Sequence, residues 1–114
     1  MIQLKKEDRF TIITPQMNSL DSHVAAEFRT QFSELLNRDP DFILLDLSRV
    51  TFMDSSGLAA IAFCFQMTDI KEKLAICAVT ERVGKLFKLT QMETLLQIYA
   101  TQQEARVALA GPDQ

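Results

Sequence analysis

The segment best equipped for chemistry is Asp54-Ser55-Ser56-Gly57, which stands between two apolar stretches. Aspartate and serine are favoured at the N-cap of a helix, so the pattern predicts a turn from a strand into a helix. A serine there faces free backbone N–H groups and the positive end of the helix dipole. Phosphorylation would add about −1.5 to −2 charges at that point. The segment is therefore either a helix start and no more, or a serine that can carry a phosphate without unfolding the domain.

The sequence does not indicate a catalytic constellation. His23 is the only histidine, and nothing pairs it with a serine or a cysteine as a hydrolytic triad requires. The three glycines are isolated, so neither a P-loop nor a dinucleotide-binding motif is present. Cys64 and Cys77 stand in apolar stretches without metal-binding spacing, which predicts reduced core thiols. We expect a protein that is not an enzyme and that has no metal and no cofactor.

The composition describes one ordinary globular domain. The chain has 114 residues, of which 47% are hydrophobic and 24% charged, and such a chain buries a core without disulfides. The net charge of −3 and the scattered basic residues argue against a nucleic-acid surface. The longest apolar run, Leu58–Phe65, is too short to span a bilayer, and residues 1–6 lack the order of a signal peptide. We expect a single domain over residues 1–114, without membrane insertion, in the cytoplasm.

Strand patterns alternate with helix patterns along the chain. Strands are predicted at residues 2–5, 9–14, 42–47, 73–79 and 95–99, and helices at residues 22–37, 58–68, 81–90 and 101–109. Asp21 and Ser22 are cap candidates for the first helix, and Thr101 with Glu104 forms a capping box for the last. The order ββαβαβαβα predicts an α/β fold with a mixed sheet of four or five strands and about four helices.

The helix predicted at residues 58–68 is apolar on two sides. One set of side chains suits the sheet: Leu58, Ile61, Ala62 and Phe65. Another set falls on the opposite side of the helical wheel: Ser56, Ala59, Ala60, Phe63 and Met67. An outward apolar stripe either packs under a neighbouring helix or meets a partner. A phosphate on Ser56, beside Asp54 and at the edge of that stripe, would repel an acidic or desolvated partner surface.

Residues 42–58, FILLDLSRVTFMDSSGL, resemble the signature of the STAS domain family, specifically of its anti-sigma-factor antagonists. Three other stretches are also similar to the family: Leu20-Asp21 before the first helix, Val83–Tyr99 at the third helix and last strand, and Glu104-Ala105 in the final helix. The chain departs from the family at Asn18 and near Met92, where many relatives have glycine. The resemblance covers nearly the whole chain and implies the STAS fold.

The resemblance also implies a partner-switching function. Antagonists of this family bind a cytoplasmic anti-sigma factor that is also a serine kinase of the histidine-kinase-like ATPase fold, and so free the sigma factor. The kinase then phosphorylates and releases the antagonist, and a phosphatase resets the switch. The phosphoacceptor that the family implies is Ser56. The family implies docking contributions from Asp21, Asp54, Ser55, Gly57 and Leu58, and the outward stripe adds Ala60, Phe63 and Met67.

Other functions remain open from the sequence. Solitary STAS proteins also serve as scaffold subunits in stress-sensing assemblies or with the ATPase subunits of lipid transporters, without acting on a sigma factor. The presence of Ser56 favours the switch over these roles. An enzyme or a nucleotide-binding protein would need a polar pocket with perturbed ionisable groups, which the sequence does not indicate. A weak homodimer through Phe63 and Met67 is a further alternative.

Overall fold

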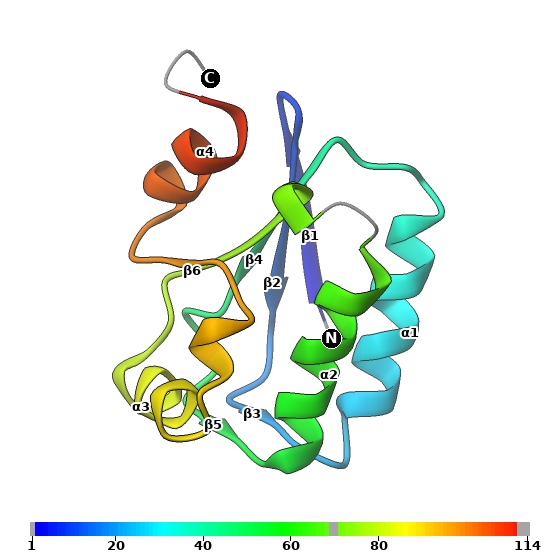
Figure 1. Cartoon of the computed structure of the whole chain (residues 1–114). Coiled ribbons are helices and arrows are strands. Elements are labelled where there is room, and N and C mark those ends of the chain that lie inside the picture. Colours follow the sequence, from blue (N-terminus) through cyan, green and yellow to red (C-terminus); the bar gives the residue numbers. More distant parts are fainter. Residues whose placement is uncertain (1, 69–70, 112–114) are drawn as a thin grey trace.

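Figure 1 shows the computed structural model of the chain, which describes residues 2–68 and 71–111. The strands are β1 (Ile2–Glu7), β2 (Phe10–Pro15), β3 (Ser19–Leu20), β4 (Phe42–Asp46), β5 (Phe52–Met53), β6 (Leu74–Cys77) and β7 (Ile98–Tyr99). The α-helices are α1 (Ala25–Leu36), α2 (Ser55–Met67), α3 (Glu81–Leu89) and α4 (Gln102–Ala110), with short 3₁₀ helices η1 (Lys71–Lys73) and η2 (Met92–Thr94). The predicted order of elements is confirmed, with two short strands, β3 and β5, in addition.

The main sheet has five strands in the order β1-β2-β4-β6-β7. β1 runs antiparallel to β2, and the remaining neighbours are parallel. The central strands β4 and β6 are almost continuously apolar because helices cover both faces of the sheet there. The expected mixed sheet within an α/β domain is therefore confirmed.

Helices cover the two faces of the sheet unequally. α1 and α2 pack beside each other on one face, and α4 lies on the other (Figure 1). The larger core cluster fills the α1–α2 side and includes the fully buried Phe28, Phe32 and Ile61. The smaller cluster lies under α4 and includes Phe10 and Leu44. Full burial of such a side chain contributes about 1.5–3 kcal/mol, so the two clusters fix the helices firmly on the sheet.

A second, two-stranded sheet joins the segments that lead into α1 and α2. β3 pairs in parallel with β5, with Leu20 opposite Met53. The carbonyl oxygen of Asn18 accepts hydrogen bonds from the backbone N–H groups of Thr51, at 2.8 Å, and Phe52, at 3.1 Å. Because β3 precedes α1 and β5 precedes α2, this pairing places the start of both helices side by side.

The first helix begins later than the sequence predicts. The side chain of Asp21 accepts a hydrogen bond from the N–H of His23 at 3.0 Å, and the Asp21 carbonyl accepts from the N–H groups of Val24 and Ala25. These bonds close a turn ahead of α1, so its N-cap is Val24, which makes no side-chain capping bond. Ser22, predicted as a cap, belongs to that turn instead.

The ends of the C-terminal elements agree better with the sequence. In the predicted capping box, Thr101 Oγ1 accepts from the N–H of Glu104 at 3.1 Å, and Glu104 Oε2 accepts from the N–H of Ala100 at 3.2 Å. The last strand is shorter than predicted, because residues 95–97 form a turn after η2 and β7 begins only at Ile98. Gly111 is the C-cap of α4, and Pro112 lies outside the described residues.

Candidate functional site

Asp54 connects the starts of the two neighbouring helices. It is the N-cap of α2, and its Oδ1 accepts from the N–H of Gly57 at 3.0 Å. Its Oδ2 accepts from the N–H of Ser22 at 3.1 Å, in the turn before α1. The Gly57 N–H, and with it the Ser22 N–H, holds the pKa of Asp54 below its ordinary value of 3.8. The carboxylate is therefore ionised at neutral pH and fixes the two turns to each other.

Ser55 and Ser56 are the first two residues of α2, directly after the Asp54 cap. Ser55 is exposed, and Ser56 is partly exposed. The N–H groups of a first helical turn lack partners within the helix, and they mark the positive end of its dipole. A phosphate on the Ser56 hydroxyl would be stabilised by the helix and would stand close in sequence to the ionised Asp54. The arrangement suits a hydroxyl that accepts charge.

Gly57 is buried where α2 meets the segment before α1. A Cβ atom at this position would collide with the carbonyl oxygen of Leu20 and press on the Met53 side chain, 3.2 Å away. Glycine is thus required so that the first turn of α2 can lie against β3. Gly57 therefore has a packing role within the domain, and its contribution to docking stays a prediction.

The structure brings the predicted residue Asp21 to the same place. Asp21 is partly buried in the turn whose Ser22 amide binds Asp54. The exposed His23 imidazole lies 3.6 Å from the Asp21 carboxylate. Leu58, in the first turn of α2, is partly buried and packs against the core. We call the predicted residues around the starts of the two helices the helix-start surface; they are Asp21, Asp54, Ser55, Ser56 and Leu58.

The outward stripe predicted for α2 is wrong at Ala60, which is fully buried. The buried face of α2 consists of Gly57, Ala60, Ile61, Cys64 and Phe65. Because α2 is apolar on nearly all sides, its hydrophobic spacing does not select a single face. The side chain of Ala60 belongs to the core and is withdrawn as a docking residue.

Phe63 and Met67 lie outside the helix-start surface. The Phe63 ring is partly buried toward α1, where the Arg29 guanidinium carbon lies 4.2 Å from the ring centroid, a cation–π contact. Phe63 thus packs beside a neighbouring helix, one of the two alternatives for this stripe. Met67 is 44% exposed and is the last residue of α2. At 1.5 Å per residue it lies about 16 Å along the helix from Ser56.

An exposed aromatic residue beside the helix-start surface was not predicted from the sequence. Phe52 is 42% exposed and stands two residues before Asp54. The guanidinium carbon of Arg82, on α3, lies 5.9 Å from its ring centroid. Phe52, Leu86 and Leu89 line a shallow apolar groove between β5 and α3. The available signal was an aromatic residue two positions before a helix cap, which sequence periodicity alone does not place on the surface.

The described residues lack two further kinds of feature. Within residues 2–68 and 71–111, no group of three or more His, Cys, Asp or Glu side chains could hold a metal ion. In the same part of the chain, none of the helices combines the length and the apolar character needed to cross a membrane.

Residues 1–105 match the STAS domain, and the chain belongs to this family. An anti-sigma F factor antagonist from Paenibacillus polymyxa is 29% identical over 111 residues, which are 95% of this chain and 95% of that protein. The crystal structure of an anti-sigma factor antagonist from Mycobacterium paratuberculosis has a TM-score of 0.86 at 18% identity and covers 96% of this chain and 92% of its own. The Bacillus cell fate determinant SpoIIAA in its phosphorylated form has a TM-score of 0.66 at 21% identity, with 92% of this chain and 96% of its own covered. The two structures share the fold of this chain.

Proposed function

We propose that this protein is an anti-sigma-factor antagonist of the cytoplasm, regulated by phosphorylation of Ser56. In this proposal it binds an anti-sigma factor that is also a serine kinase of the histidine-kinase-like ATPase fold. The kinase phosphorylates Ser56 and releases the protein, and a phosphatase restores it. The observation that carries the proposal is the partly exposed Ser56 at the second position of α2, directly after the Asp54 cap.

Family membership and the nature of the relatives support this proposal. The similar protein from Paenibacillus polymyxa is an anti-sigma F factor antagonist, and the similar Bacillus protein exists in a phosphorylated form. The match to these proteins extends over nearly the whole of this chain, so it includes the turn that carries Ser56. The partner class, the acceptor residue and the release step are carried over to this chain as the proposal.

Electrostatics explains why a phosphate would release a partner without unfolding the protein. Inside the domain, the phosphate stands in the first turn of α2, where the positive end of the helix dipole favours negative charge. Outside it, the phosphate adds about −1.5 to −2 charges beside Asp21 and Asp54, on the surface that the partner covers. A desolvated partner surface that lacks a compensating cation loses affinity when such a charge is added. A phosphate on Ser56 would therefore leave the fold intact and weaken the contact with the partner.

A binding titration with the cognate kinase tests the release step. Ser56→Asp is expected to raise the dissociation constant by about five- to 150-fold, which corresponds to about 1–3 kcal/mol for a misplaced charge at an interface. Ser55→Asp is the matched control, because Ser55 precedes Ser56 in the same helical turn and is more exposed. It is expected to have the smaller effect. Equal dissociation constants for the wild-type protein and Ser56→Asp would refute release by charge at Ser56.

The scaffold role and the homodimer differ from the switch in their dependence on Ser56. A scaffold subunit would bind its assembly independently of the charge at residue 56. A homodimer through Phe63 and Met67 would have to displace the Arg29 contact from the Phe63 ring. No observation in the structure favours either role over the switch.

A further inference from the structure

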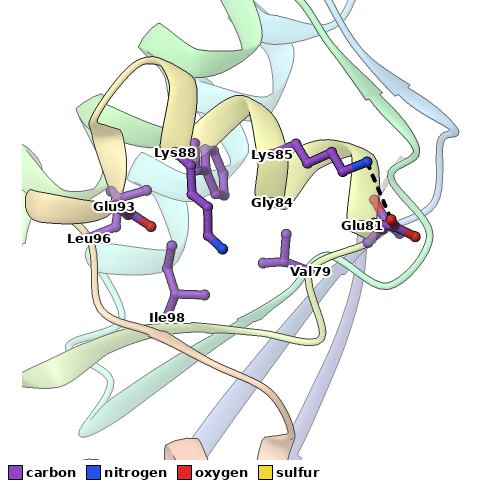
Figure 2. A pocket seen from close by; sticks show the side chains of 10 residues that line it. Val79, Glu81, Gly84, Lys85, Lys88, Glu93, Leu96 and Ile98 are labelled. Carbon is purple, nitrogen blue, oxygen red and sulfur yellow. Dashed lines mark ion pairs between the residues drawn. The ribbon is translucent and has the colours of Figure 1, made fainter.

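A cavity of about 670 Å³ lies beneath α3, on the side of that helix away from β5. Its apolar floor consists of Val79 from the loop after β6, Phe87 from α3, Leu96 from the segment before β7, and Ile98 from β7 itself. Figure 2 shows the side chains of Val79, Leu96 and Ile98 around an open space beneath α3. Pockets of about 300–1,000 Å³ with an apolar lining and a few polar groups are typical of sites for small molecules.

The positive and negative side chains at the rim of this cavity are equal in number. Two lysines, Lys85 and Lys88, and two glutamates, Glu81 and Glu93, line it. Lys85 and Glu81 form an ion pair, with 3.4 Å between the Nζ and Oε1 atoms. Neither Lys88 nor Glu93 has an ion-pair partner in the described part of the chain. In Figure 2, Lys88 extends over the cavity toward Ile98, and Glu93 lies at the same end beside Leu96.

Gly84 keeps the cavity open although the packing does not require a glycine there. It lies in the middle of α3, where glycine is less favourable than alanine. A Cβ atom at Gly84 would meet only Val79 Cγ1, at 3.7 Å, which is an ordinary contact. Gly57 differs, because a Cβ atom there would collide with backbone. The missing side chain at Gly84 therefore contributes space to the cavity and nothing that the fold needs.

We propose that this cavity binds a small apolar zwitterion of about the size of a dipeptide. The unpaired Lys88 ammonium receives the ligand's carboxylate, the unpaired Glu93 carboxylate receives its ammonium, and the apolar floor receives its side chains. The formal charges of the four rim groups sum to zero, which suits a ligand without net charge better than an anion. A dipeptide has two side chains and can cover more of the apolar floor than a free amino acid can. This site is separate from the helix-start surface and does not depend on the proposed function.

An NMR titration of the ¹⁵N-labelled full chain with the dipeptide leucylphenylalanine tests this proposal at pH 6.5, where the dipeptide is a zwitterion. Saturable shifts are expected at the backbone amides of Gly84, Leu96 and Ile98. N-acetylation or C-amidation of the dipeptide removes one charge each, and each is expected to weaken binding about three- to fivefold, as for a partly exposed ion pair. Phenylalanine alone is expected to bind more weakly than the dipeptide.

Variants assign each charge to its partner. Lys88→Gln is expected to bind the dipeptide and its C-terminal amide equally, and Glu93→Gln to bind the dipeptide and its N-acetyl form equally. Lys6→Gln is the matched control, since Lys6 is an exposed lysine on β1, at the opposite edge of the sheet.

Gly84→Leu is expected to fill the cavity and abolish binding, and Gly84→Ala to weaken it if the leucine variant does not fold. The proposal is overturned if no amide around the cavity shifts, or if the blocked dipeptides bind as well as the free one.

Discussion

At the scale of single residues, the central feature is that Asp54 and Ser56 have different roles at the start of the same helix. Asp54 is occupied by two backbone N–H groups, from Gly57 and Ser22, so its carboxylate serves the fold. Ser56, two residues later, is not the N-cap of the helix and stays partly exposed. The Asp54 carboxylate therefore orders the turn, while the nearby Ser56 hydroxyl can be phosphorylated without loss of the N-cap.

Replacing Asp54 tests the capping role. Asp54→Ala is expected to lower the urea midpoint of unfolding, and Asp54→Asn to lower it by less, because asparagine is also a good cap. The pKa of Asp54 is depressed in the folded state, so the stability that its charge contributes is fully present above the ordinary value of 3.8 and is lost as the pH falls through the lowered pKa. In urea titrations, the difference between the wild-type protein and Asp54→Asn should therefore diminish below about pH 4. A difference that grows toward acid pH would contradict the capping assignment.

At the scale of elements, α2 and α3 each contain one glycine, and the two have opposite roles. Gly57 allows α2 to touch β3, whereas Gly84 has room for a side chain. The first is required by packing between elements. The second weakens its own helix and leaves a cavity beside it.

A pair of alanine substitutions separates these roles. Gly57→Ala is expected to destabilise the domain by about 1–3 kcal/mol or more, because the new methyl group overpacks a backbone contact. Gly84→Ala is expected to raise the free energy of unfolding by up to about 1 kcal/mol, since alanine favours the helix. Chemical denaturation of both variants measures the two changes. Equal effects of the same sign would show that the space around the two glycines does not differ as described.

The long elements could be predicted from the sequence because their hydrophobic spacing is regular or their apolar runs are continuous. β3 and β5 could not be predicted, since two residues carry no periodic signal and their pairing joins residues 33 positions apart. The start of α1 was displaced because Asp21 forms its own turn, a competition that is common for aspartate. Next to Met92, Gln91 adopts a left-handed backbone with φ of 59°, which the sequence does not reveal.

The candidate site was predicted in part. The turn from Asp54 to Gly57 was located because N-cap residues between apolar runs have a clear pattern. The contact between Ser22 and Asp54 depends on the sheet pairing that the sequence did not show. Ala60 was misplaced because an all-apolar helix has no unique buried face.

At the scale of the whole molecule, the two faces of the sheet have separate cores, and each encloses one cysteine. Cys64 and Cys77 are both fully buried. Burial raises the pKa of the Cys64 thiol, and burial together with the charge of Asp46 raises the pKa of Cys77 to about 12. Thiolate, the reactive form, is therefore scarce in the folded protein near neutral pH.

Thiol labelling should consequently report on unfolding of the domain. With dithiobisnitrobenzoate at pH 7.5, we expect both cysteines to react only as fast as the protein opens, and the rate to rise steeply with urea. The two thiols should share one urea dependence, because both cores belong to one sheet. Stoichiometric labelling of either cysteine within the mixing time, without denaturant, would contradict the buried positions.

The most direct test of the central claim is the intact mass of the protein after incubation with its cognate kinase and ATP, combined with peptide mapping. The account predicts the addition of one phosphate, its location on Ser56, and no addition to Ser56→Ala, while Ser55→Ala is modified more slowly. A phosphate on Ser55 or on a threonine, or an unchanged mass for the wild-type protein beside a kinase that is active on itself or another substrate, would contradict it.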